Sequence, residues 1–189
     1  MSESLPSLAD EALVAATLDG DEIAFAEIVR RHKRRVFSTA SRFVRDTQQL
    51  DDLAQEVFLR AFRHLAKFRG EAPFEHWLAR LTVSACYDFL RRERKVRSQV
   101  SLQCIEWELH DPAPDAERSC RAAREILAAA MQQLSPDERL IVTLCELEER
   151  SIRETAQLTG WSESNVKVRA FRARRRLKTI LEQTDERPA

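Results

Sequence analysis

The chain has 189 residues, long enough for one medium-sized domain or two small domains that each bury a core. Its 31 basic side chains balance its 31 acidic ones, and a neutral chain with evenly spread charge would not be expected to bind nucleic acid. The charge is uneven, however, because basic residues concentrate in two stretches with acidic residues between them.

Several protein classes are excluded by features that the sequence lacks. No run of about eighteen apolar residues could cross a membrane, and the N-terminus, MSESLPSLADEA, is acidic and has no signal-peptide core. The four cysteines have no CxxC spacing and the four histidines are scattered, which argues against zinc and a disulfide framework. We therefore expect a soluble, cytoplasmic protein that has no membrane insertion, metal, cofactor or catalytic residues.

Because glycine is rare and apolar residues recur at helical intervals, the chain is predicted to be all-α. A short helix is expected over residues 8–18, and the Asp-Gly-Asp of residues 19–21 ends it. Residues 22–44 form the second predicted helix, whose basic middle, His32 to Arg35, is expected to be solvated surface. The apolar positions of these two helices are Leu13, Val14, Leu18, Phe25, Ile28, Val29, Val36, Ala40 and Phe43.

The third predicted helix, which Asp46 or Thr47 caps, has an acidic side. Its carboxylates lack a neighbouring histidine, lysine or apolar pocket, so an acid/base pair is not indicated. A solvated face or a face that docks a protein fits better. The predicted buried stripe is Leu50, Leu53, Val57, Ala61 and Leu65.

A loop over residues 68–73 precedes a longer helix that ends in a basic run at residues 91–97. A basic helix end beside a loop with aromatic neighbours is typical of proteins that hold single-stranded nucleic acid and stack its bases. Trp77 falls on the apolar stripe, so both core packing and base stacking stay open for it, whereas Tyr87 lies off the stripe. The stripe is Phe74, Trp77, Leu78, Leu81, Ala85 and Phe89.

Residues 98–118 contain two prolines, no sustained period and several acidic residues, which predicts a flexible acidic linker between two small helical domains. A helix is expected over about 116–134. Ser135 and Glu138 then form a capping box, with Pro136 at the first helical position. The apolar positions of these two helices are Ile126, Leu127, Ala130, Met131, Leu140, Ile141, Leu144 and Leu147.

Residues 151–181 have the features of a helix-turn-helix. Ser151 and Glu154 form a capping box, Gly160 stands where the turn needs a left-handed backbone, and Ser162 caps the second helix. Small residues at the crossing let the two helices approach closely. The buried positions are Ile152, Ala156, Leu158 or Thr159, then Val166, Ala170, Ala173, Leu177 and Ile180.

The second helix of this motif is strongly basic, with Glu163 as the single acidic residue between Ser162 and Lys178. A solvated basic helix at a domain edge is the alternative interpretation. The caps, the turn and the close crossing favour a helix that lies in the major groove of DNA. Its basic residues are Lys167, Arg169, Arg172, Arg174, Arg175, Arg176 and Lys178.

Three ordered stretches resemble the bacterial RNA polymerase sigma factors of the extracytoplasmic-function (ECF) type, in the sigma-70 family. They are DDLAQEVFLRAF from Asp51, FRGEAPFEHWLARLTVSACYDFLRRERK from Phe68, and LSPDERLIVTLCELEERSIRETAQLTGWSESNVKVRAFRARRRL from Leu134. The resemblance covers nearly the whole chain except its beginning, the linker and the tail.

The resemblance implies a transcription initiation factor, not an enzyme, that directs core RNA polymerase to a promoter set and melts the minus-ten region. It implies a sigma-2-like domain over residues 1–97, a linker over 98–117 that threads the RNA exit path, and a sigma-4-like helix-turn-helix domain over 118–189. The implied partners are promoter DNA, the β′ coiled coil and β flap of the polymerase, and an anti-sigma factor.

The resemblance also implies three sets of site residues. Core polymerase would be bound by Asp51, Asp52, Gln55, Glu56 and Phe58. Minus-ten DNA would be held by Phe68, Arg69, Trp77, Arg80, Ser84, Tyr87, Arg91 and Arg92. Minus-thirty-five DNA would be read by Ser164, Asn165, Lys167, Val168, Arg169 and Arg172, with Arg174, Arg175 and Arg176 on phosphates or the flap.

The chain departs from the family at Ser84, where Asn is common, and at Ser164-Asn165, where a Gly-Thr pair is common, so a promoter sequence does not transfer. Asn165 has the groups to bond a phosphate or an adenine edge. Two other functions stay open on the sequence alone. One is a stand-alone helix-turn-helix regulator that binds duplex DNA as a dimer, and the other is a helical enzyme or interaction protein.

Overall fold

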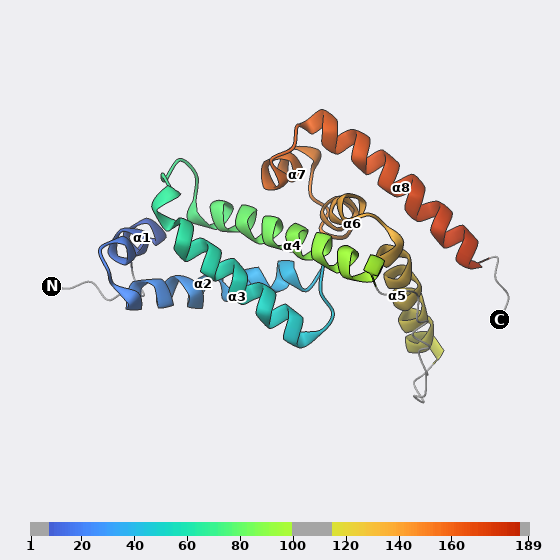
Figure 1. The fold of residues 1–189 in the computed structure, drawn as a ribbon, viewed down its shortest axis with the longest axis horizontal. Coiled ribbons are helices and arrows are strands. Elements are labelled where there is room, and N and C mark those ends of the chain that lie inside the picture. Colours follow the sequence, from blue (N-terminus) through green and yellow to red (C-terminus); the bar gives the residue numbers. More distant parts are fainter. Residues whose placement is uncertain (1–7, 100–114, 186–189) are drawn as a thin grey trace. The chain divides into compact units, whose positions relative to one another are not determined.

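The computed structural model describes residues 8–99 and 115–185, and all regular structure within these ranges is helical, as predicted (Figure 1). The chain divides into two compact units, with the main boundary between Phe89 and Leu90. The helices are α1 (Asp10–Leu18), α2 (Glu22–Ala40), α3 (Thr47–His64), α4 (Phe74–Gln99), α5 (Asp115–Gln133), α6 (Pro136–Val142), α7 (Ile152–Thr159) and α8 (Glu163–Asp185), with a 3-10 turn η2 (Leu65–Lys67) and a π-helical segment η3 (Thr143–Leu147).

The predicted linker falls mostly on residues 100–114, which lie outside the described residues, as does Cys104. Because α4 continues to Gln99 and α5 begins at Asp115, both ends of the stretch predicted as linker are helical. Cys86 is buried and Cys145 is half-buried, and both are free thiols.

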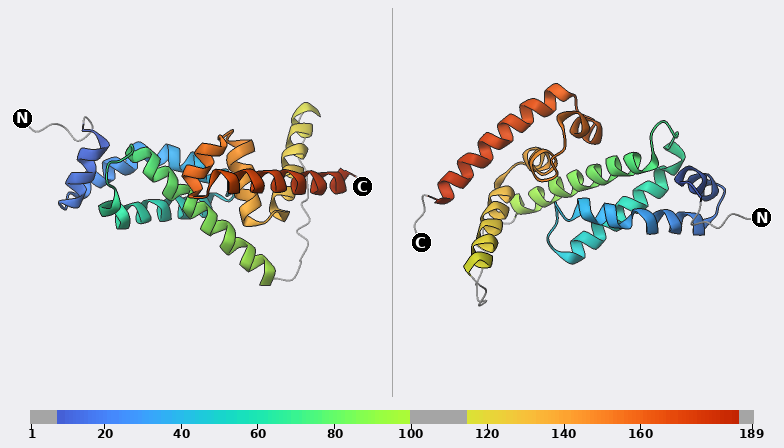
Figure 2. Two further views of the ribbon diagram at one scale, coloured as in Figure 1. Left: turned by 90° about the horizontal axis from the view of Figure 1, so that it is seen from above. Right: turned by 180° about the vertical axis from the view of Figure 1, so that it is seen from behind.

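The first unit is a helical bundle in which α1 packs against α2, and α2 against α3 (Figure 2). Helices α2 and α3 are both capped at their N-termini, at the predicted break over residues 19–21 and at the predicted cap Asp46. The Asp21 carboxylate accepts from the N–H groups of Ile23 and Ala24 at 2.9 and 3.2 Å, and the Asp46 carboxylate accepts from that of Gln49 at 2.8 Å. The largest buried side chains of this unit are Leu13, Ile28, Phe43, Val57, Leu65 and Phe74.

Some predicted boundaries and burials of the first unit are wrong. Helix α2 ends at Ala40, because the Phe43 N–H bonds to the Ala40 carbonyl in a turn, although Phe43 itself is buried. Leu18 is 53% exposed, and the neighbouring Thr17 is the buried residue in the last turn of α1. In α4, Leu81 and Phe89 are only half-buried, and the buried side chains include Val83 and Cys86.

The prediction that the basic middle of α2 is solvated surface is wrong at His32, which is buried. Its Nε2 lies 2.8 Å from Asp10 Oδ2, and Arg31 donates to the same carboxylate at 3.0 Å, which ties α1 to α2. The buried Glu27 carboxylate accepts hydrogen bonds from Arg30 at 2.6 and 2.7 Å and from Arg31 at 2.8 Å. These hydrogen bonds lower the pKa of Glu27 from 4.5 to about 2.

Glu27 should therefore make the stability of the first unit depend on pH. Folding lowers the pKa of Glu27, so the stability that its carboxylate contributes is complete above about pH 4.5 and is lost as the pH falls toward 2. We expect the difference in Tm between the wild type and Glu27→Gln to shrink between about pH 5 and about pH 3. Glu22→Gln, which changes an exposed carboxylate of the same helix, is the control. A difference that stays constant over this range would contradict the assignment.

The second unit contains α5, α6, α8 and most of α7, and therefore most of the helix-turn-helix. Helix α8 packs against both α5 and α6. Both predicted capping boxes are present, Ser135 with Glu138 and Ser151 with Glu154. The predicted stripe of α8 is confirmed, and the core comprises Ala130, Met131, Leu134, Ile141, Val142, Val166, Ala170, Ala173 and Ile180.

The helix that begins at Pro136 does not continue to Leu147 as a regular α-helix. It changes to the wider π-helical segment η3 at Thr143, which turns the following side chains, and Leu147 is 39% exposed. Ile126, predicted to be on the apolar side of α5, is 45% exposed. Thr155, which was not predicted to be buried, is fully enclosed, with its hydroxyl 3.5 Å from the Cys145 sulfur.

Gly160 ends α7 in the left-handed conformation that the sequence predicts, with φ at 75°, and its N–H bonds to the Ala156 carbonyl at 2.9 Å. A β-carbon here would meet no atom within 4 Å, so Gly160→Ala should cost backbone strain alone, about 1–2 kcal/mol. We expect this loss in the free energy of unfolding measured by denaturant titration. Gly160→Asn should cost less, because Asn tolerates this conformation. An alanine variant as stable as the wild type would refute the strain argument.

Candidate nucleic-acid interface

The acidic side of α3 carries most of the residues predicted to bind core polymerase. Asp51, Asp52 and Gln55 are exposed. Glu56 is half-buried and accepts a hydrogen bond from Arg60 Nε at 2.6 Å. Since residues three and four apart share one side of a helix, these four side chains form a single negatively charged surface.

The fifth residue of that set, Phe58, lies in the core at 9% exposure, so it is misplaced as a surface contact. Leu59 and Phe62, which were not among the predicted site residues, are 42% and 52% exposed on α3. Their positions off the buried stripe were the signal that could have found them. Leu59 lies one turn after Gln55, and we call Asp51, Asp52, Gln55, Glu56 and Leu59 the docking face.

An aromatic cluster lies where the loop meets the start of α4. The Phe68 ring is 5.4 Å from Phe74 and 5.7 Å from Trp77, and Phe74 is 5.4 Å from Trp77. Phe74 is buried, whereas Phe68 and Trp77 are half-buried. Trp77 therefore packs on core side chains and also keeps part of its ring at the surface, which fits both interpretations of this residue.

The other predicted minus-ten residues also reach the surface. Arg80, Ser84 and Arg91 are exposed and Tyr87 is half-buried. Arg69, in the loop before α4, is exposed, as is Arg92. Spacings of three and four along α4 place five of the predicted residues on one face of the helix, and these are Trp77, Arg80, Ser84, Tyr87 and Arg91.

The first turns of α8 present the residues predicted to read minus-thirty-five DNA. The Ser162 hydroxyl accepts from the Asn165 N–H at 3.3 Å, which confirms the predicted cap. Ser164, Asn165, Lys167 and Arg172 are exposed. The basic surface continues along α8, where Arg175 and Arg176 are exposed and Arg174 donates to Glu146 at 2.7 Å.

Arg169 is held on three sides. Its guanidinium donates to the Asp137 carboxylate of α6, and its Nε donates to Asn165 Oδ1 at 2.6 Å. The guanidinium carbon lies 4.3 Å from the centre of the Trp161 ring. Asp137 stands 32 positions before Arg169, and no sequence pattern links the two. This clamp fixes the plane of the guanidinium before any DNA is bound.

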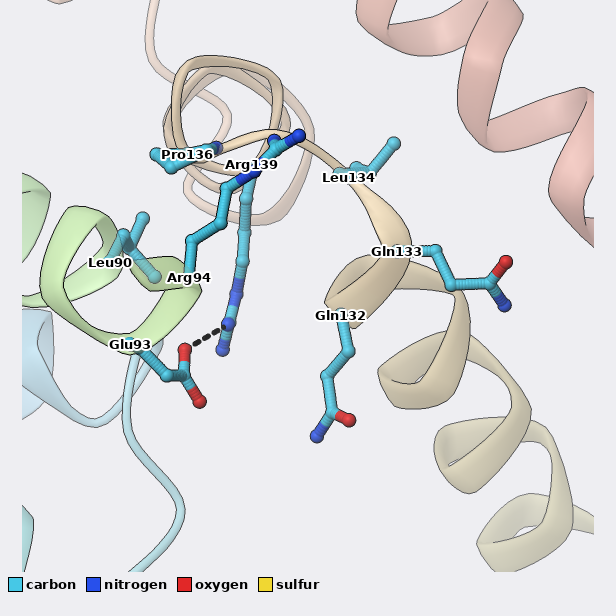
Figure 3. A pocket seen from close by; sticks show the side chains of 8 residues that line it. All are labelled: Leu90, Glu93, Arg94, Gln132, Gln133, Leu134, Pro136 and Arg139. Atoms are coloured by element: carbon cyan, nitrogen blue, oxygen red, sulfur yellow. Dashed lines mark hydrogen bonds and ion pairs between the residues drawn. The ribbon is translucent and has the colours of Figure 1, made fainter. Parts of the chain in front are cut away.

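A hollow of about 260 Å³ lies in the second unit, and Arg139 donates to Glu93 at 2.9 Å beside it. Figure 3 shows the side chains that line this hollow. No nucleophile and base are paired there. Among the described residues, no three His, Cys, Asp or Glu side chains gather as metal ligands. None of the helices in residues 8–99 and 115–185 combines the length and apolar character that crossing a bilayer requires. The hollow is lined by Leu90, Glu93, Arg94, Gln132, Gln133, Leu134, Pro136 and Arg139.

Two protein-family models match the chain in order. Sigma-70 region 2 matches residues 28–96, and Sigma-70, region 4 matches residues 124–177. The first range includes the docking face and the predicted minus-ten residues, and the second includes the predicted minus-thirty-five residues.

Similar proteins match along almost the full chain. The ECF RNA polymerase sigma factor SigM of Mycobacterium tuberculosis (strain ATCC 25618 / H37Rv) is 34% identical over 173 residues, covering 91% of this chain and 84% of that protein. The ECF RNA polymerase sigma-E factor of Escherichia coli (strain K12) is 31% identical over 182 residues, covering 92% and 93%.

Two solved structures share the fold. CnrH, in complex with the cytosolic domain of CnrY, superposes with a TM-score of 0.56 at 24% identity and covers 93% of this chain and 99% of that one. The sigma factor RpoE from Bartonella quintana, in complex with the anti-sigma factor NepR, superposes with a TM-score of 0.55 at 20% identity, covering 84% and 96%. At these identities the likeness concerns the fold.

Proposed function

Because the chain belongs to the extracytoplasmic-function sigma factors of the sigma-70 family, we propose a role for each surface described above. Sigma factors of this type are not enzymes, and they direct RNA polymerase to promoters, as this chain does. The stand-alone regulator and the helical enzyme are thereby set aside. We propose a sigma-2-like domain over residues 1–97, a linker over 98–117 and a sigma-4-like domain over 118–189.

The docking face binds the β′ coiled coil of core polymerase in this proposal. Asp51, Asp52 and Gln55 are exposed and together carry two full negative charges. They favour a positively charged partner, because complementary charge speeds the encounter of two proteins and disfavours wrong partners. Leu59 adds apolar area at the C-terminal end of this face. Phe58 lies in the core beneath the docking face and supports α3 by its packing.

The exposed face of α4 and the loop before it hold the melted minus-ten strand. Arg69, Arg80, Arg91 and Arg92 neutralise phosphates, which releases counterions and strengthens binding at low salt. Partly exposed Phe68, Trp77 and Tyr87 offer rings on which unpaired bases stack, and Ser84 offers a hydroxyl. Stacking and phosphate contacts together offset the few kcal/mol that extruding a base from the duplex costs.

Helix α8 enters the major groove of the minus-thirty-five element through its first two turns. Its buried stripe holds the helix on the second unit and leaves Ser164, Asn165, Lys167 and Arg172 exposed, while Arg169 is presented by its clamp. Farther along the helix, Arg174, Arg175 and Arg176 contact phosphates or the β flap. The predicted cap at Ser162 supports this assignment because it sets where the reading helix begins.

An anti-sigma factor is proposed as the regulatory partner, and the cytoplasm as the location. The support for the first is that both similar structures are complexes, one of them with a protein described as an anti-sigma factor. The support for the second is that core polymerase and the bacterial chromosome are cytoplasmic.

Run-off transcription tests the function. Purified core RNA polymerase with and without the full chain is supplied with fragmented genomic DNA at a fixed salt concentration, and duplex binding by the chain alone is measured in parallel. We expect discrete new transcripts whose templates share two spaced upstream elements, with little binding by the chain alone. Silence with core polymerase, together with tight binding to a palindrome, would contradict the proposal.

A further inference from the structure

Two apolar side chains of α8 are exposed, Val168 at 49% and Phe171 at 65%. The same helix buries Val166 and Ala170 at 0% and 2% exposure. At 3.6 residues per turn, Val168 lies about 200° around the helix from Val166, which is the side farthest from the core. Val168 therefore does not hold the helix to its unit, and a branched side chain at an exposed helical position adds nothing to helix stability.

The neighbours of Val168 on the helix surface favour nucleic acid as its partner. Ser164 lies one turn before it, and Arg172 and Arg175 lie one and two turns after it, all exposed. Residues 164–178 include no acidic side chain. A small apolar side chain flanked by arginines fits a polyanion such as DNA that displays an apolar group at its edge. It fits an apolar protein surface less well.

We propose that Val168 contacts the 5-methyl group of a thymine in the upstream promoter element. This inference rests on the proposed function and narrows it, because it requires a T·A pair opposite Val168. The thymine methyl is the one apolar group that a base pair displays in the major groove. Valine has no donor or acceptor on its side chain, so this methyl group is what it can recognise there.

Valine also discriminates against the other bases. A cytosine at this position has a hydrogen where thymine has its 5-methyl group, so the apolar contact with Val168 would be lost. The contact with thymine and its loss with cytosine therefore favour the same base.

The test uses the holoenzyme, formed from core polymerase and the full chain, on a promoter found by run-off transcription. Each thymine of the upstream element is replaced, one at a time, by deoxyuridine, which pairs identically and lacks only the methyl group. We expect one position at which the substitution lowers open-complex formation by the wild type about fourfold, the value of one methyl group. Val168→Ala should lose this sensitivity, and Val168→Ile should keep it.

Ile126→Ala, which shortens another exposed apolar side chain of the second unit, is the matched control and should keep the fourfold difference. Normal transcription by the wild type from every deoxyuridine template would overturn the methyl contact and leave the proposed function standing. A sensitivity that persists in Val168→Ala would also overturn it, because another side chain would then read the methyl group. If no promoter-specific transcript arises with core polymerase, the proposed function fails and this inference fails with it.

Discussion

Replacing both Asp51 and Asp52 with arginine should weaken binding of the chain to core RNA polymerase at least about 100-fold, because like charges placed together across an interface cost several kcal/mol. Both carboxylates are exposed on the docking face, so the change should leave the folded structure intact. Binding is measured by titrating labelled chain with core polymerase, and run-off transcription should fall in parallel.

Asp19→Arg combined with Glu22→Arg makes the same change of net charge at exposed positions outside the docking face. This control should bind core polymerase like the wild type apart from a small effect that salt screens. Thermal unfolding of both variants should resemble that of the wild type. If the control loses as much affinity as the test variant, net charge and not the docking face would explain the loss.

Arg169→Ala should weaken promoter binding by the holoenzyme by about 1–3 kcal/mol, and the loss should be selective for one base-pair position. The clamp of Asp137, Asn165 and Trp161 holds the guanidinium in one orientation, so little side-chain entropy is lost when it meets a base. The measurement is open-complex formation on promoters in which each base pair of the upstream element is varied.

Arg175→Ala is the comparison for Arg169→Ala, since it removes an exposed arginine proposed to contact phosphate or the flap. If Arg175 contacts phosphate, its loss should weaken binding about equally on all sequences and lower the salt slope by about one. Asp137→Asn should reproduce part of the selective loss by loosening the clamp. A uniform loss in Arg169→Ala, with a reduced salt slope, would make Arg169 a phosphate contact instead.

Local features of the fold could be predicted from neighbouring residues. The capping boxes at Ser135 and Ser151 each need two residues three positions apart, and both formed as expected. The left-handed turn at Gly160 and the buried stripe of α8 are local in the same sense. The acidic side of α3 and the basic side of α8 were found in the same way, because exposed residues are those left over once a periodic apolar stripe has been assigned. The role of each surface came from the resemblance to sigma factors.

Contacts between distant residues could not be predicted from the sequence. His32 looked like part of a basic surface, yet it is buried against Asp10 of the preceding helix. Phe58 looked like a docking residue, and the packing of α3 placed it in the core. The π-helical segment after Val142 has no local sign in the residues that form it.

The sequence by itself determined the all-α class, the helix starts, the helix-turn-helix and the resemblance to sigma factors, because caps, turns and apolar periods depend on residues within a turn or two of one another. Only the tertiary structure decided which side chains of each surface are exposed and which contacts with other helices fix their positions. Arg169 shows the reason: its partner Asp137 lies on another helix, and only the packing of α6 against α8 brings the two charges together.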